Sequence, residues 1–242
     1  DFQILLRVED MALDFDPDWP RLEGLEGIVH FHNHGLAIAT QGGRIHDVPL
    51  VEVQASIPDL AETHLLGLRG TAQGPFAAAL GFLGATPLKI VLGALPRLFT
   101  AKGLARVDLD MDLPLDREDY PEDRLRLDGA LSWPAQADAG DAGDPGDPGD
   151  EPPAAHLALE GTSLVLADLA GAVSFNADGV TRSRVLGRFL GRPLTLDLER
   201  IRNPEFPEGL TGLRIGGQSA VSELSGHLPA PFWRHLEGEA PW

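Results

Sequence analysis

Apolar and polar residues alternate along most of the chain, and this pattern predicts β-strands with one buried face. The clearest example lies between residues 105 and 113, where every second residue is apolar and the intervening ones are charged. Similar patterns predict further strands at residues 2–8, 11–15, 22–31, 36–40, 49–57, 65–71, 125–133, 156–160, 172–175, 180–184, 193–198, 213–215 and 220–228. The predicted fold class is therefore mostly β, with antiparallel strands that have one apolar and one polar side.

One stretch has a helical period instead, and it predicts a small pair of helices at about residues 75–99. The first helix would begin after Gly74-Pro75. The second would have Thr86 as its N-cap and Pro87 in its first turn. Its buried face would be formed by apolar residues spaced three and four apart, namely Leu88, Val91, Leu92, Leu95, Leu98 and Phe99. A membrane span is disfavoured here, because prolines and polar residues interrupt the roughly 20 continuous apolar residues that a span needs.

The alternation leaves open how the apolar side of the sheet is covered. A second sheet or the helical pair would give a closed core if it covered this side completely. Partial cover would leave an apolar groove. The pattern alone does not separate these alternatives, and without further information it favours the closed core.

The chain is strongly acidic, with 19 Lys and Arg against 37 Asp and Glu and a net charge of −18. This charge argues against a nucleic-acid partner and against electrostatic docking on an anionic membrane. The chain contains no cysteine, so it has neither disulfides nor thiolate chemistry. Because it has only one Tyr and four Trp, the predicted apolar surface is aliphatic.

A run of Gly, Asp and Pro divides the chain into two parts. Residues 135–155 contain no large apolar residue, so we expect a disordered acidic loop there. Residues 1–134, with the helical pair inserted at 75–99, would form a first unit. Residues 156–242 would form a second unit that is truncated at its C-terminus. Both ends of the sequence look like cuts through a longer protein, because the chain starts inside an alternating pattern and ends abruptly.

The two parts match each other at an offset of 144 residues. In the first copy the matching residues are Leu22, Leu25, Gly27, Val29, Phe31, Gly35, Gly43, Arg44, Pro49 and Leu50. In the second copy they are Leu166, Leu169, Gly171, Val173, Phe175, Gly179, Gly187, Arg188, Pro193 and Leu194. Repetition at this scale indicates a structural unit that is used again along an elongated protein.

Several motifs, and above all their order, resemble the AsmA-like superfamily, specifically its large YhdP branch. The first motif is Asp18-Trp19-Pro20-x-Leu22-x-x-Leu25-x-Gly27-x-x-x-Phe31-x-x-x-Gly35-Leu36. The next is Gly74-Pro75, followed by Gly81-Phe82-Leu83-x-x-Thr86-Pro87-Leu88 and then by a strand that closes in Asp112-Leu113-Pro114-Leu115. The second copy, from Leu169 to Leu194, fits the same family. The resemblance covers most of the chain apart from residues 135–155.

The resemblance implies a fragment of a long envelope protein of a Gram-negative bacterium, anchored in the inner membrane and crossing the periplasm. Such proteins are similar to bridge-like lipid transfer proteins, whose elongated, curved antiparallel sheet forms an apolar groove for phospholipid acyl chains. The implied function is phospholipid transport between the inner and outer membranes, in support of outer-membrane lipid homeostasis. The implied partners are phospholipid, neighbouring repeats of the same longer chain, and the envelope membranes through other parts of that chain.

If the groove exists, its wall would come from the apolar faces of the predicted strands. Each buried methylene contributes roughly 0.8 kcal/mol, so acyl chains need no specific polar contact there. The wall residues that the alternation suggests are Phe31, Val107, Leu109, Met111, Leu113, Leu125, Leu127, Leu157, Leu159 and Phe175. The alternative function is a closed structural or protein-interaction β domain without lipid transport. A glycan-binding domain is disfavoured, because it would need exposed aromatic residues.

Two groups of residues invite a metal-binding interpretation. His30, His32 and His34 would share one face of a strand, but adjacent same-face residues lie about 6.6–7 Å apart, which hinders convergence on zinc. The alternate aspartates of residues 108–112 follow the regular pattern of a solvated strand face. We therefore expect no metal site.

Catalytic chemistry finds no specific support either. Ser163, His156 and Asp168 would complete a triad on paper, yet no nucleophile elbow surrounds the serine. We expect no enzyme activity and no cofactor.

Overall fold

The computed structural model describes residues 2–62, 65–89, 99–115, 125–133, 154–159, 164–203, 206–220 and 239–241. A short helix, α1 (Phe76–Ala85), follows the sixth strand. The strands are β1 (Gln3–Leu13), β2 (Leu22–His32), β3 (Gly35–Gln41), β4 (Arg44–Ile45), β5 (Val48–Ile57), β6 (Leu65–Pro75), β7 (Phe99–Lys102), β8 (Leu104–Pro114), β9 (Arg126–Trp133), β10 (His156–Leu159), β11 (Val165–Asn176), β12 (Gly179–Val180), β13 (Ser183–Phe189), β14 (Arg192–Asn203), β15 (Phe206–Ala220) and β16 (Glu239–Pro241).

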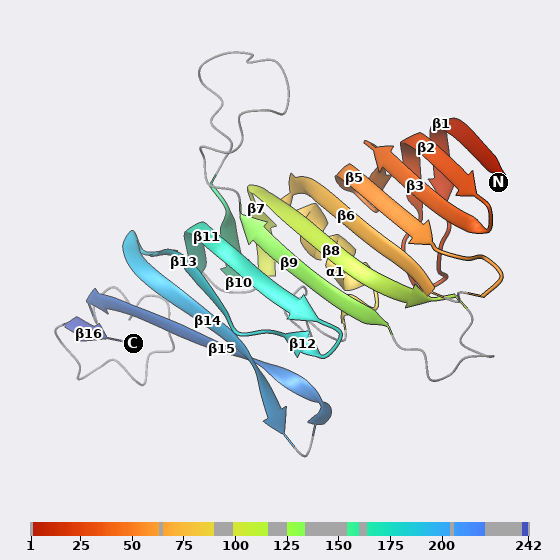
Figure 1. Ribbon diagram of the computed structural model, residues 1–242. Helices are drawn as coiled ribbons and strands as arrows, with labels where there is room; N and C mark the ends of the chain where they lie inside the picture. The colour runs from red at the N-terminus through yellow and green to blue at the C-terminus, as the bar shows by residue number, and fades with distance from the viewer. Residues whose placement is uncertain are drawn as a thin grey trace, which may run out of the picture.

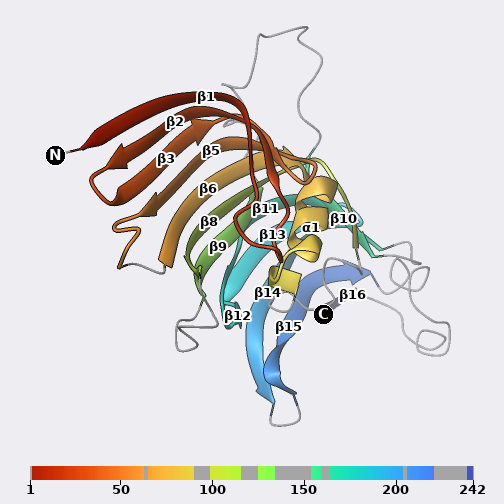
Figure 2. The same cartoon turned by 90° about the vertical axis from the view of Figure 1, so that its right-hand side faces the viewer.

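The strands form one sheet whose order largely follows the sequence. Hydrogen-bonded neighbours follow one another in the order β1-β2-β3-β5-β6-β8-β9-β11-β13-β14-β15-β16. The short strands β4, β7, β10 and β12 pair with other strands outside this order. The pairs are antiparallel throughout. Figure 1 shows the strands side by side, and Figure 2 shows that they bend into an arch with α1 on its inner side. The prediction of a mostly β, curved antiparallel sheet is confirmed.

The alternation places most apolar side chains of neighbouring strands on the inner side of this arch. In β8, Ala105, Val107, Met111 and Leu113 are buried. The register aligns residues of the same kind across strands, and one such row comprises Leu6, Val29, Ile38, Ala55, Leu68, Met111 and Leu127. The sheet therefore has one continuous apolar face, which we call the inner face, and an opposite outer face.

A proline stands at each end of helix α1. Pro75, with φ −54° and ψ 130°, precedes its first residue. Its early alanines favour helix, and the extended conformation of Thr86 at φ −105° and ψ 170° ends it before Pro87. The first helix of the predicted pair is thus present.

The second predicted helix is only partly described. The Thr86 hydroxyl accepts a hydrogen bond from the Leu88 amide at 3.3 Å, as expected of an N-cap, but residues 90–98 lie outside the described residues. Phe99 was wrongly assigned to this helix, because it begins β7 and pairs with Leu159. No helix within the described ranges has the length and apolar character needed to cross a membrane.

The internal repeat has a geometric counterpart. Leu22 pairs with Ile45, and the equivalent residue Leu166 pairs with Phe189. Gly24 and its equivalent Asp168 both have positive φ, at 64° and 52°. The following turns match as well, with φ 54° at His46 and 52° at Leu190. The two copies therefore share a strand irregularity and a turn in addition to their side chains.

The division into two units, with a boundary at residues 135–155, stays a prediction. Residues 134–153 lie outside the described residues. On either side of this gap, β9 pairs directly with β11 from Gly171↔Trp133 to Asn176↔Asp128. Backbone hydrogen bonding therefore continues from residues of the first predicted unit to residues of the second.

Candidate functional site

The inner face is a broad apolar surface, and most predicted wall residues lie on it. Four of them come from β8, where Val107, Leu109, Met111 and Leu113 follow the strand's alternation. Leu127 pairs with Met111, and Phe175 pairs with Gly129, itself the partner of Leu109. The sheet therefore brings these residues together although they are far apart in sequence.

The wall residues differ in how deeply they are buried. Val107, Met111, Leu113, Leu127 and Phe175 are buried within the protein. Leu109, Leu125 and Leu157 are partly buried and pack against the same core. Phe31 is half-buried and stands apart from that core, near β1. Leu159 lies in β10, but its side chain is not described. As a continuous lipid-facing wall, this set stays a prediction.

Helix α1 and the connection between β1 and β2 cover the middle of the inner face. From α1, Phe76, Ala79, Phe82 and Leu83 are buried against the sheet. From the connection, Phe15 and Trp19 make a tilted ring contact at a centroid distance of 6.0 Å, and the ring centroids of Trp19 and Phe82 are 6.5 Å apart. Figure 2 shows both segments under the arch.

A gap in the sheet floor is filled by an aromatic ring. A Cβ at Gly129 would lie 2.4 Å from the Phe175 ring and 2.9 Å from a Leu109 methyl group. Phe175 therefore occupies the space that a side chain at position 129 would need. The side chains of Phe175 and Leu109 thus pack over Gly129 on the inner face.

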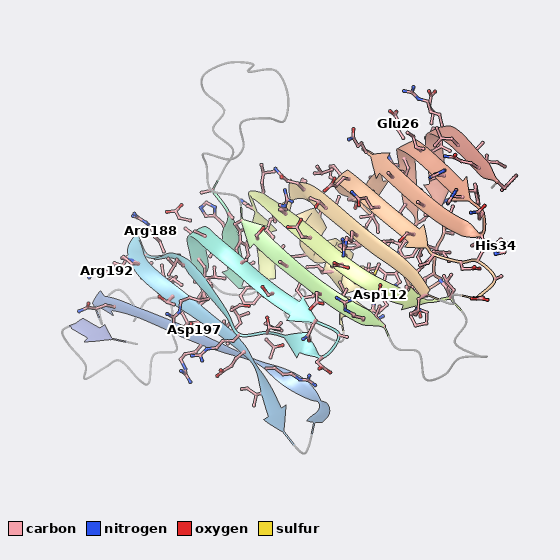
Figure 3. The ribbon with its side chains drawn as sticks, viewed as in Figure 1. Glu26, His34, Asp112, Arg188, Arg192 and Asp197 are labelled. Carbon is pink, nitrogen blue, oxygen red and sulfur yellow. The ribbon has the colours of Figure 1, made fainter. Side chains whose placement is uncertain are left out.

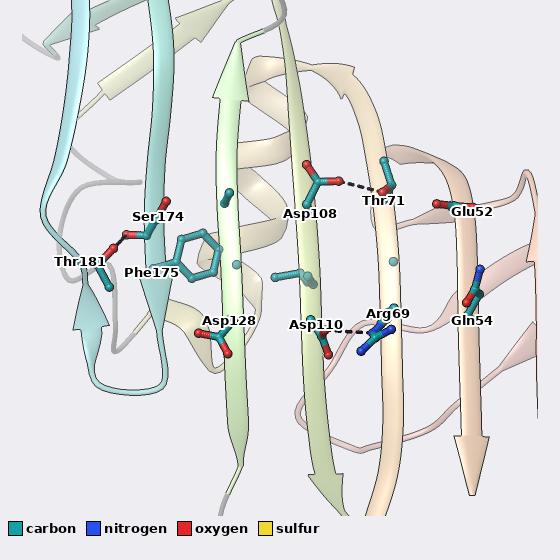
Figure 4. A pocket seen from close by; sticks show the side chains of 14 residues that line it. Glu52, Gln54, Arg69, Thr71, Asp108, Asp110, Asp128, Ser174, Phe175 and Thr181 are labelled. Atoms are coloured by element: carbon teal, nitrogen blue, oxygen red, sulfur yellow. Dashed lines mark hydrogen bonds and ion pairs between the residues drawn. The ribbon is translucent and has the colours of Figure 1, made fainter.

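Among the described residues, two apolar cavities lie beneath the cover. The smaller, about 40 Å³, lies between Trp19, Phe82 and the floor residues Val107 and Met111. The larger, about 80 Å³, lies between α1 and the floor residues Leu131, Trp133 and Val173. Val107 and Leu131 are cross-strand partners yet line different cavities. The boundary between the cavities therefore runs between β8 and β9, where Figure 4 shows α1 behind the sheet.

The two ends of the inner face are much less covered. At the β1 end, 47% of Leu6 is exposed, although it lies in the same row as Met111, which is 2% exposed. At the other end, Ile215 pairs with the buried Leu196 and is 39% exposed. Apolar surface is thus accessible at both ends of the strand order and covered in between.

The outer face is polar and laced with ion pairs. The labelled Asp112 and Asp197 lie on it in Figure 3, where Arg126 contacts Asp112 at 3.2 Å and Arg184 contacts Asp197 at 2.7 Å. The hydrogen bond from Arg184 lowers the pKa of Asp197 below its usual value. These contacts agree with the prediction of a solvated face.

A shallow hollow in this outer face is shown in Figure 4. Thr71 donates to Asp108 at 2.8 Å, and Arg69 donates to Asp110 at 2.9 Å. Its small residues, such as Ala130 and Ser174, create the depression. Asp108 and Asp110, two of the carboxylates that line the hollow, are therefore already paired within the protein.

The three histidines do not converge. His30 and His32 have ring centroids 6.1 Å apart, and His30 contacts the Gln3 amide at 2.8 Å. His34 lies in the turn and pairs with Asp59 at 3.4 Å. The pKa of Asp59 is lowered mainly by a hydrogen bond from the Ala61 amide. Among the described residues, no group of three or more potential ligands is placed to hold a metal ion. Ser163, the nucleophile of the paper triad, lies outside the described residues.

Sequence reasoning missed the aromatic residues that cover the floor. Phe76 and Trp133 meet edge to face at 5.4 Å, while Phe15, Trp19 and Phe82 form a second aromatic contact chain. Trp19 and Phe82 do lie within the motifs that resemble the AsmA-like superfamily, and this position was the sequence feature that could have pointed to them. The alternation rule overlooks them because Trp19 and Phe82 lie outside strands.

Comparisons with known proteins agree with this architecture. A family model described as YhdP protein matches residues 1–242. The chain is similar to a protein named intermembrane phospholipid transporter YhdP from Escherichia coli strain K12, with 32% identity over 117 residues. That match spans 48% of this chain and 9% of the relative, so the chain corresponds to a small part of that protein's length. No solved structure matches the chain.

Proposed function

The chain belongs to the YhdP protein family, and from this membership we propose that it is a segment of a longer envelope protein that carries phospholipid between membranes. In this proposal the inner face of the sheet holds the acyl chains. The protein would be anchored in the inner membrane of a Gram-negative bacterium and would cross the periplasm to the outer membrane. Its other contacts would be neighbouring repeats of the same longer chain, and it would catalyse no reaction.

The continuity of the inner face is the observation that carries this proposal. Apolar side chains follow one another across the strands in register, from Leu6 on β1 to Leu127 on β9. Beyond the middle, Val185, Leu196 and Ile215 continue the pattern on β13, β14 and β15. A surface with this extent along the strand order suits a long, flexible hydrocarbon better than a compact ligand.

Hydrocarbon chains gain their binding energy on such a surface without specific contacts. Each methylene removed from water contributes about 0.8 kcal/mol, and no single contact holds the chain in one place. The polar headgroup would remain outside, because the floor residues offer it few partners. Movement along the face therefore costs little once the acyl chains are buried.

A closed structural or protein-interaction domain is the second candidate, and one observation favours it. The middle of the inner face is covered by α1 and by Phe15 and Trp19, and four of the predicted wall residues, namely Val107, Met111, Leu127 and Phe175, are buried in the core there. In a closed domain these residues would form an ordinary core. The bare ends of the same face would then bind protein instead of lipid.

The two candidates differ in what a charge on the inner face would do. We would incubate the chain with vesicles of phosphatidylethanolamine and phosphatidylglycerol, isolate it, and quantify bound phospholipid by mass spectrometry. Leu6→Glu places a carboxylate on the inner face of β1. Leu5→Glu is the matched control, because Leu5 is 62% exposed and points to the outer face of the same strand.

The proposal expects Leu6→Glu to reduce bound phospholipid severalfold, because a carboxylate is costly to bury beside hydrocarbon. Leu5→Glu should leave it unchanged. Absence of phospholipid from the unmodified chain would favour the closed domain. Equal losses in both variants would show that lipid does not follow the inner face.

A further inference from the structure

A cation ends the apolar row that β14 contributes to the inner face. The buried residues of this row are Leu194, Leu196 and Leu198. The strand continues to pair in register with β15, so Arg200 lies on the same face, two residues after Leu198. In the first copy, β5 carries the equivalents of Pro193 and Leu194, and its row ends on the buried Ile57. Arg200 therefore departs from the apolar pattern of the repeat.

The guanidinium of Arg200 lies at the border of the sheet, beside the turn between β11 and β12. Strand β12 lies close to β14 there (Figures 1 and 2). The stem of Arg200 passes over Gly179, where an added Cβ would come within 3.3 Å of the Arg200 Cδ. The absence of a side chain at position 179 therefore leaves room for the arginine.

The carboxylate beside Arg200 is a readily exchanged partner. The Nη1 of Arg200 lies 3.4 Å from a carboxylate oxygen of Asp178. The side chain of Arg200 is 28% exposed, and that of Asp178 is 80% exposed. An ion pair in which one group is so exposed contributes little, because water and salt screen it. Another anion can therefore take the place of Asp178 at low cost.

Accessible apolar surface begins next to this cation. On the neighbouring strand β15, Thr211 pairs with Arg200, and Leu213 pairs with Leu198. Leu213 is 38% exposed, and Ile215, the next residue on the same face, is 39% exposed. Successive residues on one face lie roughly 6.6–7 Å apart along a strand. A molecule of lipid size can therefore place hydrocarbon on Leu213 and an anionic group on Arg200.

We propose that Arg200 binds the phosphate of a phospholipid whose acyl chains lie on the exposed inner face of β15, and that this phosphate replaces Asp178 at the guanidinium. The inference rests on the proposed function and adds a headgroup contact to it. A guanidinium suits this role, because it is always charged and its fork of N–H donors matches the oxygens of a phosphate. The headgroups would then project from the border of the sheet that carries the β11–β12 turn.

Two soluble short-chain lipids separate the phosphate contact from the burial of hydrocarbon. Dioctanoyl phosphatidylglycerol and dioctanoylglycerol have the same acyl chains, and only the first carries a phosphate. Isothermal titration calorimetry would measure their affinities for the chain. Arg200→Gln should lower the affinity for the phosphatidylglycerol about three- to tenfold, as expected for one partly exposed charged contact. Its affinity for dioctanoylglycerol should stay unchanged.

A second variant changes the other partner and keeps the cation. Asp178→Asn removes the carboxylate that competes with the phosphate. Its affinity for the phosphatidylglycerol should therefore rise about two- to fivefold, while that for dioctanoylglycerol stays the same. An ion pair with a purely structural role predicts no such gain. Because Arg200 is retained, this measurement does not depend on the folding of Arg200→Gln.

Two other arginines provide matched controls. Arg214 is exposed on the outer face of β15, opposite Asp197. Arg192 begins β14 and lies on the same face as Arg200, at the other end of the strand. Arg214→Gln and Arg192→Gln each remove one positive charge, as Arg200→Gln does. Both should bind the phosphatidylglycerol as tightly as the unmodified chain.

The outcomes separate this inference from the proposed function. A loss in Arg200→Gln and a gain in Asp178→Asn, both confined to the lipid with a phosphate, support the site. An unchanged affinity in Arg200→Gln, or equal losses in the two control variants, overturns it, while the holding of acyl chains on the inner face still stands. An equal loss for both lipids in Arg200→Gln with an unchanged circular dichroism spectrum also overturns it. An unchanged or lowered affinity in Asp178→Asn overturns the exchange of partners. If the unmodified chain binds neither lipid, the proposed function and the site fall together.

Discussion

The covered middle and the bare ends of the inner face have the same sequence pattern and opposite environments. Leu6 and Met111 stand in one row of the sheet, yet the first is 47% exposed and the second 2% exposed. The difference comes from α1 and from the connection that carries Phe15 and Trp19. Alternation therefore determines which face a side chain occupies, while non-strand segments determine whether that face meets water.

The largest expected difference between the two regions is in stability. Phe82→Ala removes a ring that is buried between Trp19 and the floor, so the free energy of unfolding should fall by about 3–5 kcal/mol. Leu6→Ala at the bare end should cost about 1 kcal/mol or less. Urea unfolding followed by circular dichroism measures both. Similar losses would mean that the cover does not distinguish the two regions.

A smaller effect should appear at the floor itself. Gly129→Ala introduces a Cβ that forces Phe175 and a Leu109 methyl group to move, and overpacking of this kind costs about 1–3 kcal/mol. Gly67→Ala is the control, because its Cβ would meet only ordinary contacts at 3.5 Å or more on the outer face. Thermal unfolding of the two variants gives the comparison. An unchanged midpoint for Gly129→Ala would show that the Phe175 ring is free to shift.

The smallest expected effect on stability is on the outer face, which the cover of the inner face does not influence. The pKa of Asp197 is lowered by the hydrogen bond from Arg184. A carboxyl whose pKa is lowered on folding stabilises the protein above its unfolded pKa of about 4 and loses this contribution as the pH falls through its folded value. Asp197→Asn should therefore be slightly less stable than the unmodified chain at neutral pH.

This difference should vanish in acid, and it should be small because exposed ion pairs contribute little. Unfolding midpoints measured from neutral pH down to about pH 2 would show the convergence. A difference that persists in acid would assign the effect to something other than the ionised pair.

Much of the sheet was predictable from sequence, because strand alternation is a local property. Val107, Met111 and Leu113 of β8 face the core, as the pattern indicates. The sequence match between the two copies also extends to their backbone conformation, because the equivalent residues Gly24 and Asp168 both have positive φ. Phe99 was misassigned because its spacing from Leu95 also fits a helix, whereas its pairing with Leu159 depends on a segment more than fifty residues away.

The cover of the inner face was not predictable in the same way. Trp19 reaches Phe82 only because the connection after β1 folds back under the arch. No periodicity marks such a contact, since neither residue lies in a strand and they are far apart in the chain. The burial of Val107 and Met111 therefore depends on tertiary packing that the pattern of their own strand does not contain.

The orientation of α1 has a kinetic consequence for the proposed transport. The helix runs alongside β8 and β9 behind the sheet, as Figures 1 and 4 show, and so it stands across the direction in which the strands succeed one another. A molecule travelling in that direction would meet the ten residues of α1 as a barrier. The rate at which lipid passes the segment would then be limited by how often α1 moves away from the sheet. Diffusion along the exposed ends of the inner face would be faster than this step.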